Sequence, residues 1–158
     1  MKIGNKLSHL LNITKGLRQE CCISPTFYKI YVRKALEEWK RKCHRMGIPS
    51  ENMTLYTLHF ADDQVVLAGN KDDLEYMPHK LKEIYEKWGL DMNLNKTKYS
   101  CIGETHNNLK LDKENEIEFC QEYKYLGVIF DTSGTDDKEI RSRVIQARKS
   151  IACLNGIL

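Results

Sequence analysis

Residues 60–63, with the sequence Phe-Ala-Asp-Asp, constrain the fold more than any other segment of the chain. An apolar, β-prone run over residues 55–61 precedes the two aspartates, and a second apolar run over residues 65–68 follows them. Two such runs around a short polar reversal predict a β-hairpin that carries acid at its turn. A pair of carboxylates suits a hard cation such as Mg²⁺, although aspartate-rich turns are also common without any ligand. Asp62 is the first aspartate of the chain.

Two helices are predicted on either side of this hairpin. Ser24 is a plausible N-cap with Pro25 at the first helical position, and apolar residues at helical spacing extend this helix to about Cys43. A second helix is predicted from the cap Asn70 to Gly89, with one continuous apolar face.

The remaining segments mix β signals with one last helix. A short hairpin is expected between residues 3 and 14, and a helix with an apolar stripe is expected from about residue 136 onward. Gly127 allows a tight bend within the last β segment. The predicted strands of the second half cover residues 99–102, 109–111, 117–119 and 123–130. The order favours an α+β fold with antiparallel hairpins and helices on one face.

Composition and charge narrow the class of protein. The 158 residues, 41% hydrophobic and 30% charged, are enough for one domain with a core. No apolar run approaches membrane-spanning length, so we expect a soluble intracellular protein of the nucleus or cytoplasm, without a membrane partner. The six cysteines lack zinc-site spacing and are expected to be reduced.

The net charge of +3 does not by itself indicate a nucleic-acid partner, but the basic residues are clustered. Seven lie between Lys29 and Arg45, and five lie between Lys138 and Lys149. Such clusters can neutralise phosphates, or they can be solvated helix faces.

Five features follow one another along the chain. A glycine-led loop that contains Arg and Gln ends in Ser-Pro before a helix, and the acidic hairpin follows. An amphipathic helix ending in Trp88-Gly89, a polar run over residues 93–98 and the segment Tyr125-Leu126-Gly127 complete the order. From about residue 3 to residue 158, this order resembles the palm of reverse transcriptases (RNA-directed DNA polymerases). It is most similar to the reverse transcriptases of LINE-type, non-LTR retrotransposons.

The resemblance implies a partial polymerase palm over residues 1–134 and the start of a thumb helix over residues 135–158. It implies two-metal nucleotidyl transfer with Mg²⁺ as cofactor, an RNA template, a DNA primer and deoxynucleoside triphosphates as partners. Asp62 and Asp63 would be catalytic and metal-binding. Nucleotide and template contacts would come from Gly16, Arg18, Gln19, Ser24, Pro25 and Lys96. The primer grip would be Tyr125, Leu126 and Gly127.

Three departures from the family pattern accompany the resemblance. The chain lacks the upstream metal-binding aspartate and the fingers, so this polypeptide is expected to be inactive alone and to need that missing segment as a partner. Glu20 stands where the family usually has glycine, and Pro78 lies inside a predicted helix. The alternatives are a non-catalytic nucleic-acid-binding module and a remnant without function.

Overall fold

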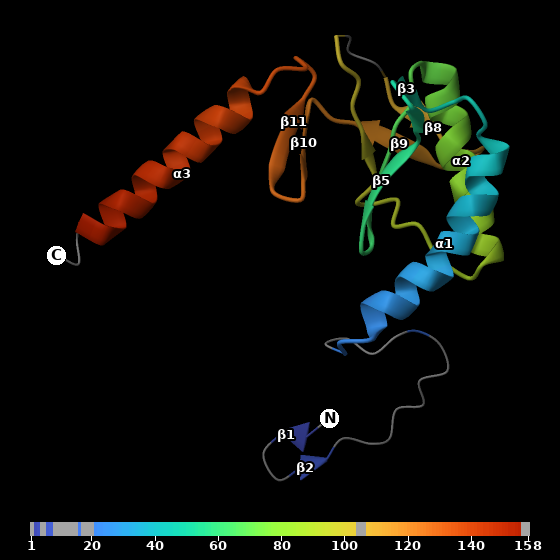
Figure 1. Ribbon diagram of the computed structural model, residues 1–158, viewed down its shortest axis with the longest axis horizontal. Coiled ribbons are helices and arrows are strands. Elements are labelled where there is room, and N and C mark those ends of the chain that lie inside the picture. Colours follow the sequence, from blue (N-terminus) through green and yellow to red (C-terminus); the bar gives the residue numbers. More distant parts are fainter. Residues whose placement is uncertain (1, 4–5, 8–15, 17–20, 104–106, 156–158) are drawn as a thin grey trace.

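Two long helices pack against each other and form the larger core (Figure 1). The computed structural model describes residues 2–3, 6–7, 16, 21–103 and 107–155. Helix α1 is Ser24–Lys42 and helix α2 is Lys71–Lys87. Their buried side chains meet, and the indole Nε1 of Trp39 donates a hydrogen bond of 2.9 Å to the Met77 carbonyl oxygen. The buried residues of this core are Ala35, Trp39, Cys43, Met77, Leu81 and Ile84.

The N-cap of α1 is Ile23, so the prediction of Ser24 as the cap was wrong. Helical bonding starts one residue earlier than expected, because the Phe27 N–H already donates to the Ile23 carbonyl at 3.1 Å. Pro25 was predicted at the first helical position but is the second residue of the helix, because the helix begins at Ser24. The buried residues of α1 begin at Val32, whereas Phe27, in its first turn, is 57% exposed.

Both predicted ends of α2 are confirmed. The Asn70 side chain accepts a hydrogen bond of 2.8 Å from the Asp73 N–H, and Gly89 follows the helix with φ +67°. Pro78 does not end the helix, which continues to Lys87. Pro78 is buried together with its neighbour Met77. Packing of this face therefore outweighs the lost backbone hydrogen bond.

Short antiparallel hairpins make up most of the β structure. The prediction of one apolar strand over residues 55–61 was wrong, because β4 (Met53–Leu55) and β5 (Thr57–Phe60) are separate strands that pair with different partners. The pair β3–β4 was not predicted, since Gly47 and Pro49 suggested only a helix stop. The hairpins are β1 (Lys2–Ile3) with β2 (Lys6–Leu7), β3 (Ile48–Ser50) with β4 (Met53–Leu55), β5 (Thr57–Phe60) with β6 (Asp63–Val66), and β10 (Glu122–Tyr125) with β11 (Val128–Asp131).

A three-stranded sheet covers a second, smaller core. Strand β9 (Glu116–Phe119) lies in the middle, parallel to β7 (Lys98–Tyr99) and antiparallel to β8 (Leu109–Lys110). The parallel pair departs from the expectation of antiparallel hairpins alone. The buried residues are Tyr99, Leu109, Leu111 and Ile117.

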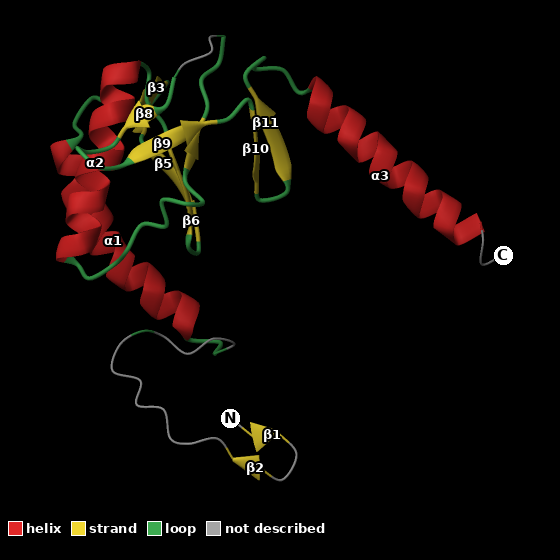
Figure 2. Ribbon diagram, turned by 180° about the vertical axis from the view of Figure 1, so that it is seen from behind, coloured by secondary structure: helices red, strands yellow, loops and turns green. Residues whose placement is uncertain are grey.

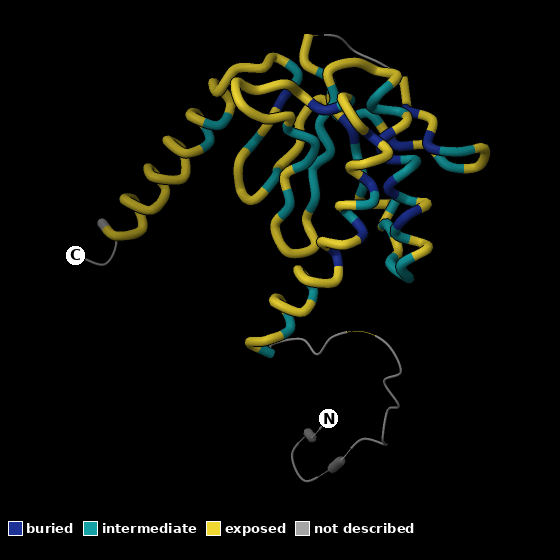
Figure 3. Tube along the Cα trace, turned by 45° about the vertical axis from the view of Figure 1, so that its right-hand side comes forward, coloured by how far each residue is buried: buried dark blue, intermediate teal, exposed yellow. Residues whose placement is uncertain are grey.

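The last helix, α3 (Asp137–Asn155), extends away from the rest of the described chain. Seen from behind in Figure 2, α1 and α2 lie on one side of the small sheets, and the β10–β11 hairpin lies between those sheets and α3. Figure 3 shows α3 as almost entirely exposed. Its predicted apolar stripe includes Ile140, Val144 and Ile151, which are 57%, 44% and 57% exposed. The predicted α+β class is confirmed.

Candidate functional site

The two aspartates lie at the tip of the β5–β6 hairpin, as the sequence predicted. Phe60 pairs with Asp63, so Ala61 and Asp62 form a two-residue turn. Ala61 has φ +53°, a left-handed conformation that suits such a turn but is unfavourable for alanine. Both carboxylates are exposed. The hairpin therefore presents its negative charge outward at its tip.

A hydrogen bond attaches this hairpin to α2 close to its acidic tip, and further bonds connect that point to the base. The Tyr85 hydroxyl donates to Gln64 Oε1 at 2.5 Å, and Gln64 Nε2 donates to Thr57 Oγ1 at 3.1 Å. The Thr57 hydroxyl in turn donates to the Val65 carbonyl at 2.7 Å. Sequence reasoning assigned Tyr85 only to a core stripe and gave Gln64 no role. The two residues are 21 positions apart, and no sequence pattern links them, so this contact could not be predicted.

A side chain of α1 packs beside the acidic hairpin. The rings of Tyr28, on α1, and His59, on β5, have centroids 6.2 Å apart. Burial raises the pKa of Tyr28, and the charge of Asp62 raises it further. Burial lowers the pKa of His59, and Asp62 opposes that shift. The ring contact therefore places the first part of α1 beside the acidic hairpin, where the charge of Asp62 acts on both rings.

Asp63 lies near the β10–β11 hairpin. Burial raises the pKa of Tyr125, and the Asp63 charge adds to the rise. Tyr125 precedes a two-residue turn in which Leu126 has φ +49° and Gly127 has φ +86°. Two positive φ angles are typical of a type I′ hairpin turn. The tight bend predicted at Gly127 is therefore confirmed, and the charge of Asp63 acts on Tyr125, which directly precedes the turn.

The donor chemistry at the acidic turn fits Mg²⁺ in part. Mg²⁺ is usually held by one or two carboxylates together with water and substrate phosphates. Asp62 and Asp63 could supply those carboxylates. Within residues 2–3, 6–7, 16, 21–103 and 107–155, however, no three His, Cys, Asp or Glu side chains come together as a metal site. The aspartate pair is thus at most part of a magnesium site.

The predicted nucleotide and template residues are only partly placed. Arg18 and Gln19 lie outside the described residues. Gly16 is exposed with φ +108°. Ser24 and Pro25 occupy the first turn of α1, one turn before Tyr28. The end of the predicted loop therefore lies on the same helix as Tyr28, whose ring packs against His59 of the acidic hairpin.

Lys96 lies in a turn over residues 93–97 that follows α2. Its N–H donates to the Asn93 carbonyl at 3.1 Å, and the Thr97 hydroxyl donates to the same oxygen at 2.9 Å. The Lys96 side chain is exposed. The contacts that the structure gives Lys96 are local to this turn, so they do not connect it to Asp62 or Asp63.

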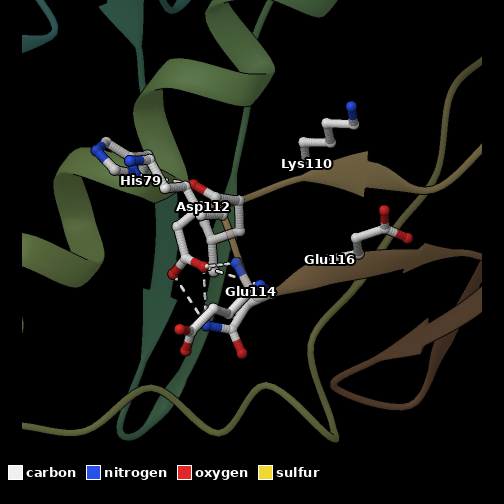
Figure 4. A pocket seen from close by; sticks show the side chains of 8 residues that line it. His79, Lys110, Asp112, Glu114 and Glu116 are labelled. Atoms are coloured by element: carbon white, nitrogen blue, oxygen red, sulfur yellow. Dashed lines mark hydrogen bonds between the residues drawn. The ribbon is translucent and has the colours of Figure 1, made fainter.

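A surface cavity of about 700 Å³ lies elsewhere, beside the β8–β9 loop (Figure 4). Asp112 accepts bonds from the Asn115 N–H at 2.8 Å and from Lys82 Nζ at 2.9 Å. Lys82, followed by Asn115, holds the pKa of the Asp112 carboxyl well below its usual range. The hydrogen-bonding capacity of the Asp112 carboxylate is thus used within the protein. We therefore assign the cavity to the structure of the β8–β9 loop and not to a binding site.

The comparisons with known proteins bear on the greater part of the chain. A family model described as reverse transcriptase (RNA-dependent DNA polymerase) matches residues 2–130. A search of curated proteins finds no match. Among the described residues, no helix is both long enough and apolar enough to cross a membrane.

Proposed function

The chain belongs to the reverse transcriptase (RNA-dependent DNA polymerase) family, and we propose that it is part of the enzyme of a LINE-type, non-LTR retrotransposon. In this proposal residues 1–134 belong to the palm and residues 135–158 begin the thumb. That boundary falls between β11 and α3. The partners are an RNA template, a DNA primer and deoxynucleoside triphosphates.

The placement of the aspartate pair carries the proposal. Asp62 and Asp63 lie exposed at a hairpin tip; the Tyr28 ring of α1 lies 6.2 Å from the His59 ring of the same hairpin, and the charges of Asp62 and Asp63 raise the pKa values of Tyr28 and Tyr125. Segments separated by more than 30 residues on each side thus converge on one acidic turn. Such convergence supports a shared site for nucleotide and primer end.

We assign Asp62 and Asp63 as ligands of Mg²⁺. When bound, the metal would stabilise negative charge on the reacting phosphate. Lys96 would add positive charge near the triphosphate, and Gly16, Arg18, Gln19, Ser24 and Pro25 would line the path of template and nucleotide. Tyr125, Leu126 and Gly127 would hold the primer end.

We further propose that these 158 residues do not synthesise DNA alone. Residues 1–61 contain no aspartate, and the described residues bring no third carboxylate to the pair. A primer-extension assay on poly(rA)/oligo(dT) with Mg²⁺ tests this. Synthesis by the chain above the level of its Asp62→Asn variant would contradict it.

Complementation tests the site itself. A polypeptide that supplies fingers and the first palm segment should be needed for any synthesis. With that polypeptide present, Asp62→Asn and Asp63→Asn should abolish extension, while Asp91→Asn, an exposed aspartate elsewhere, should leave it unchanged. Extension that survives both turn substitutions would refute the assignment.

A second candidate function is nucleic-acid binding without catalysis. The basic residues of α1 and of the turn after it are all exposed: Lys29, Arg33, Lys34, Lys40, Arg41, Lys42 and Arg45. Only Arg33 among them has an ion pair within the described chain, with Glu37 at 2.9 Å. This surface can contact phosphates.

Salt dependence tests this second candidate. Affinity for an RNA–DNA hybrid should fall steeply between about 50 and 200 mM salt and should survive Asp62→Asn and Asp63→Asn. Lys40→Gln with Arg41→Gln should reduce the salt slope by roughly one per lost phosphate contact. Lys113→Gln, on the exposed β8–β9 loop, is the matched control. Binding that is absent, together with no synthesis after complementation, would favour a remnant without function.

A further inference from the structure

Two side chains of α3 contact the turn and the outer edge of the β10–β11 hairpin. Arg143 Nη2 donates to the Gly127 carbonyl at 2.9 Å, and Glu139 Oε2 accepts from the Ile129 N–H at 2.9 Å. Arg143 Nε also donates to Glu139 Oε1 at 2.5 Å. The three bonds form one connected group that spans the helix and the hairpin.

The strand register explains why the Ile129 N–H is available to the helix. Tyr125 and Val128 close the two-residue turn, so the next pair, Lys124 and Ile129, is the pair whose N–H groups point away from the partner strand. Without α3, the Ile129 N–H would lie at an open strand edge. Glu139 therefore accepts the outward-pointing N–H of Ile129. This contact requires the register in which Lys124 pairs with Ile129.

The turn held by these bonds is conformationally unfavourable for its sequence. Leu126 has φ +49°, a left-handed conformation that residues with a Cβ rarely adopt. Gly127 has φ +86°, and a Cβ built on it would lie 4.0 Å from Arg143 Nη2. The external bonds to Gly127 and Ile129, both of which follow Leu126 in the chain, therefore help to keep the turn in this conformation.

A separate contact fixes the start of α3. The carboxylate of Asp131, whose side chain is only 3% exposed, pairs with Lys138 Nζ at 3.2 Å and accepts the Ser133 N–H at 2.8 Å. This contact lies at the end of β11, whereas Glu139 and Arg143 reach back to the turn. The helix is thus attached at two points, and only the second touches the turn.

We propose that Glu139 and Arg143 are positioning residues that couple the orientation of α3 to the conformation of the Tyr125–Gly127 turn. This rests on the proposed function, in which that turn holds the primer end and α3 begins the thumb. A movement of α3 that breaks the Arg143 bond frees the turn. Conversely, a ligand that orders the turn fixes the helix.

Amide exchange at Ile129 tests the contact without any ligand. Glu139→Ala should accelerate exchange of this amide by about tenfold or more, because a hydrogen bond to a charged acceptor is lost. Arg143→Gln should accelerate it less, and Arg143→Lys should restore part of the protection, since lysine can still donate to Gly127. Arg148→Gln removes the same charge from an exposed position of α3 and should change nothing.

Core amides of α2 serve as the folding control and should exchange at the wild-type rate in every variant. Exchange at Ile129 that is equal in Glu139→Ala and Arg148→Gln, with the core intact, would overturn the proposal.

Addition of a poly(rA)/oligo(dT) hybrid tests the coupling. In the wild-type chain and in Arg148→Gln, the amide signals of Gly127 and of residues 145–153 should shift together. In Arg143→Gln the Gly127 signal should still shift while those of residues 145–153 stay in place. Helix signals that shift equally in Arg143→Gln would overturn the coupling. If the hybrid shifts no signal of the turn in the wild-type chain, the primer-grip assignment fails, and the exchange experiment alone decides the contact.

Discussion

Ala61 and Leu126 occupy the first loop position of two hairpins with left-handed backbone, φ +53° and φ +49°. Neither residue suits this conformation, which costs about 1–2 kcal/mol for a residue with a Cβ. Each of them adjoins residues that we assign to the functional site. Local strain of this kind often accompanies functional turns.

Substitution of Leu126 by asparagine should stabilise the chain. Asparagine adopts positive φ more readily than leucine, and Asn-Gly is a favoured pair in type I′ turns. We expect the free energy of unfolding to rise by up to about 1 kcal/mol, measured by urea denaturation. Leu58→Asn is the control, because Leu58 is similarly exposed, at 40% against 52%, but lies in extended strand. An equal effect of both changes would show that backbone strain is not the cause.

Among the elements, α2 followed the sequence most closely. Its cap, its apolar face and its terminal glycine are local signals, and each lies within one element. The acidic hairpin was predicted for the same reason, because the reversal and both apolar runs lie within 14 residues. Pro78 is a local signal against a helix, and the helix predicted through it is present because burial of that face outweighs it.

The cap of α2 gives a direct measure of such a local signal. Asn70→Ala removes the acceptor of the Asp73 N–H, and we expect a loss of about 1 kcal/mol in the free energy of unfolding. Thermal or urea unfolding with far-UV circular dichroism measures it. Asn95→Ala, at an exposed turn position, should be neutral. A cap substitution no more costly than this control would mean that α2 is held by packing alone.

Contacts between elements were beyond sequence reasoning. The Gln64–Tyr85 bond, the approach of Tyr28 to Asp62 and the bond from Arg143 to Gly127 all join segments whose relative placement depends on packing. The β3–β4 hairpin was missed because Gly47 and Pro49 carry the same turn signals whether a strand or a loop follows. The acidic turn was therefore predictable, but its neighbours were not.

For the molecule as a whole, the core lies between α1 and α2 and not along α3. Ile84→Ala removes a side chain that is 1% exposed and should cost about 2–5 kcal/mol in the free energy of unfolding. Ile140→Ala, at a position 57% exposed, should change it by less than about 0.5 kcal/mol. Urea unfolding followed by tryptophan fluorescence compares the two. Similar costs would mean that the α3 stripe is packed in solution.

The free energy of unfolding should also depend on pH, because the pKa of Asp112 is lowered in the folded protein. Lys82 and Asn115 hold the folded pKa of this carboxyl below its usual range, so its contribution is present above the unfolded pKa and is lost as pH falls through about 4 and below. Asp112→Asn should lower the urea midpoint at pH 7 and weaken its decline towards pH 3. Asp91→Asn, an exposed aspartate, should keep the wild-type profile. An unchanged decline in Asp112→Asn would assign the acid sensitivity to other groups.

The bond between Tyr85 and Gln64 has a consequence for the acidic tip. Gln64 directly follows Asp63, so this bond fixes β6 beside Asp63 and leaves Ala61 and Asp62 as the turn residues beyond the anchored point. Loss of the Tyr85 hydroxyl would free Gln64 from α2, so a longer part of the hairpin, including both Asp62 and Asp63, could change position. The Tyr85 hydroxyl, 21 residues after Gln64, thus restricts the positions that the two carboxylates can take.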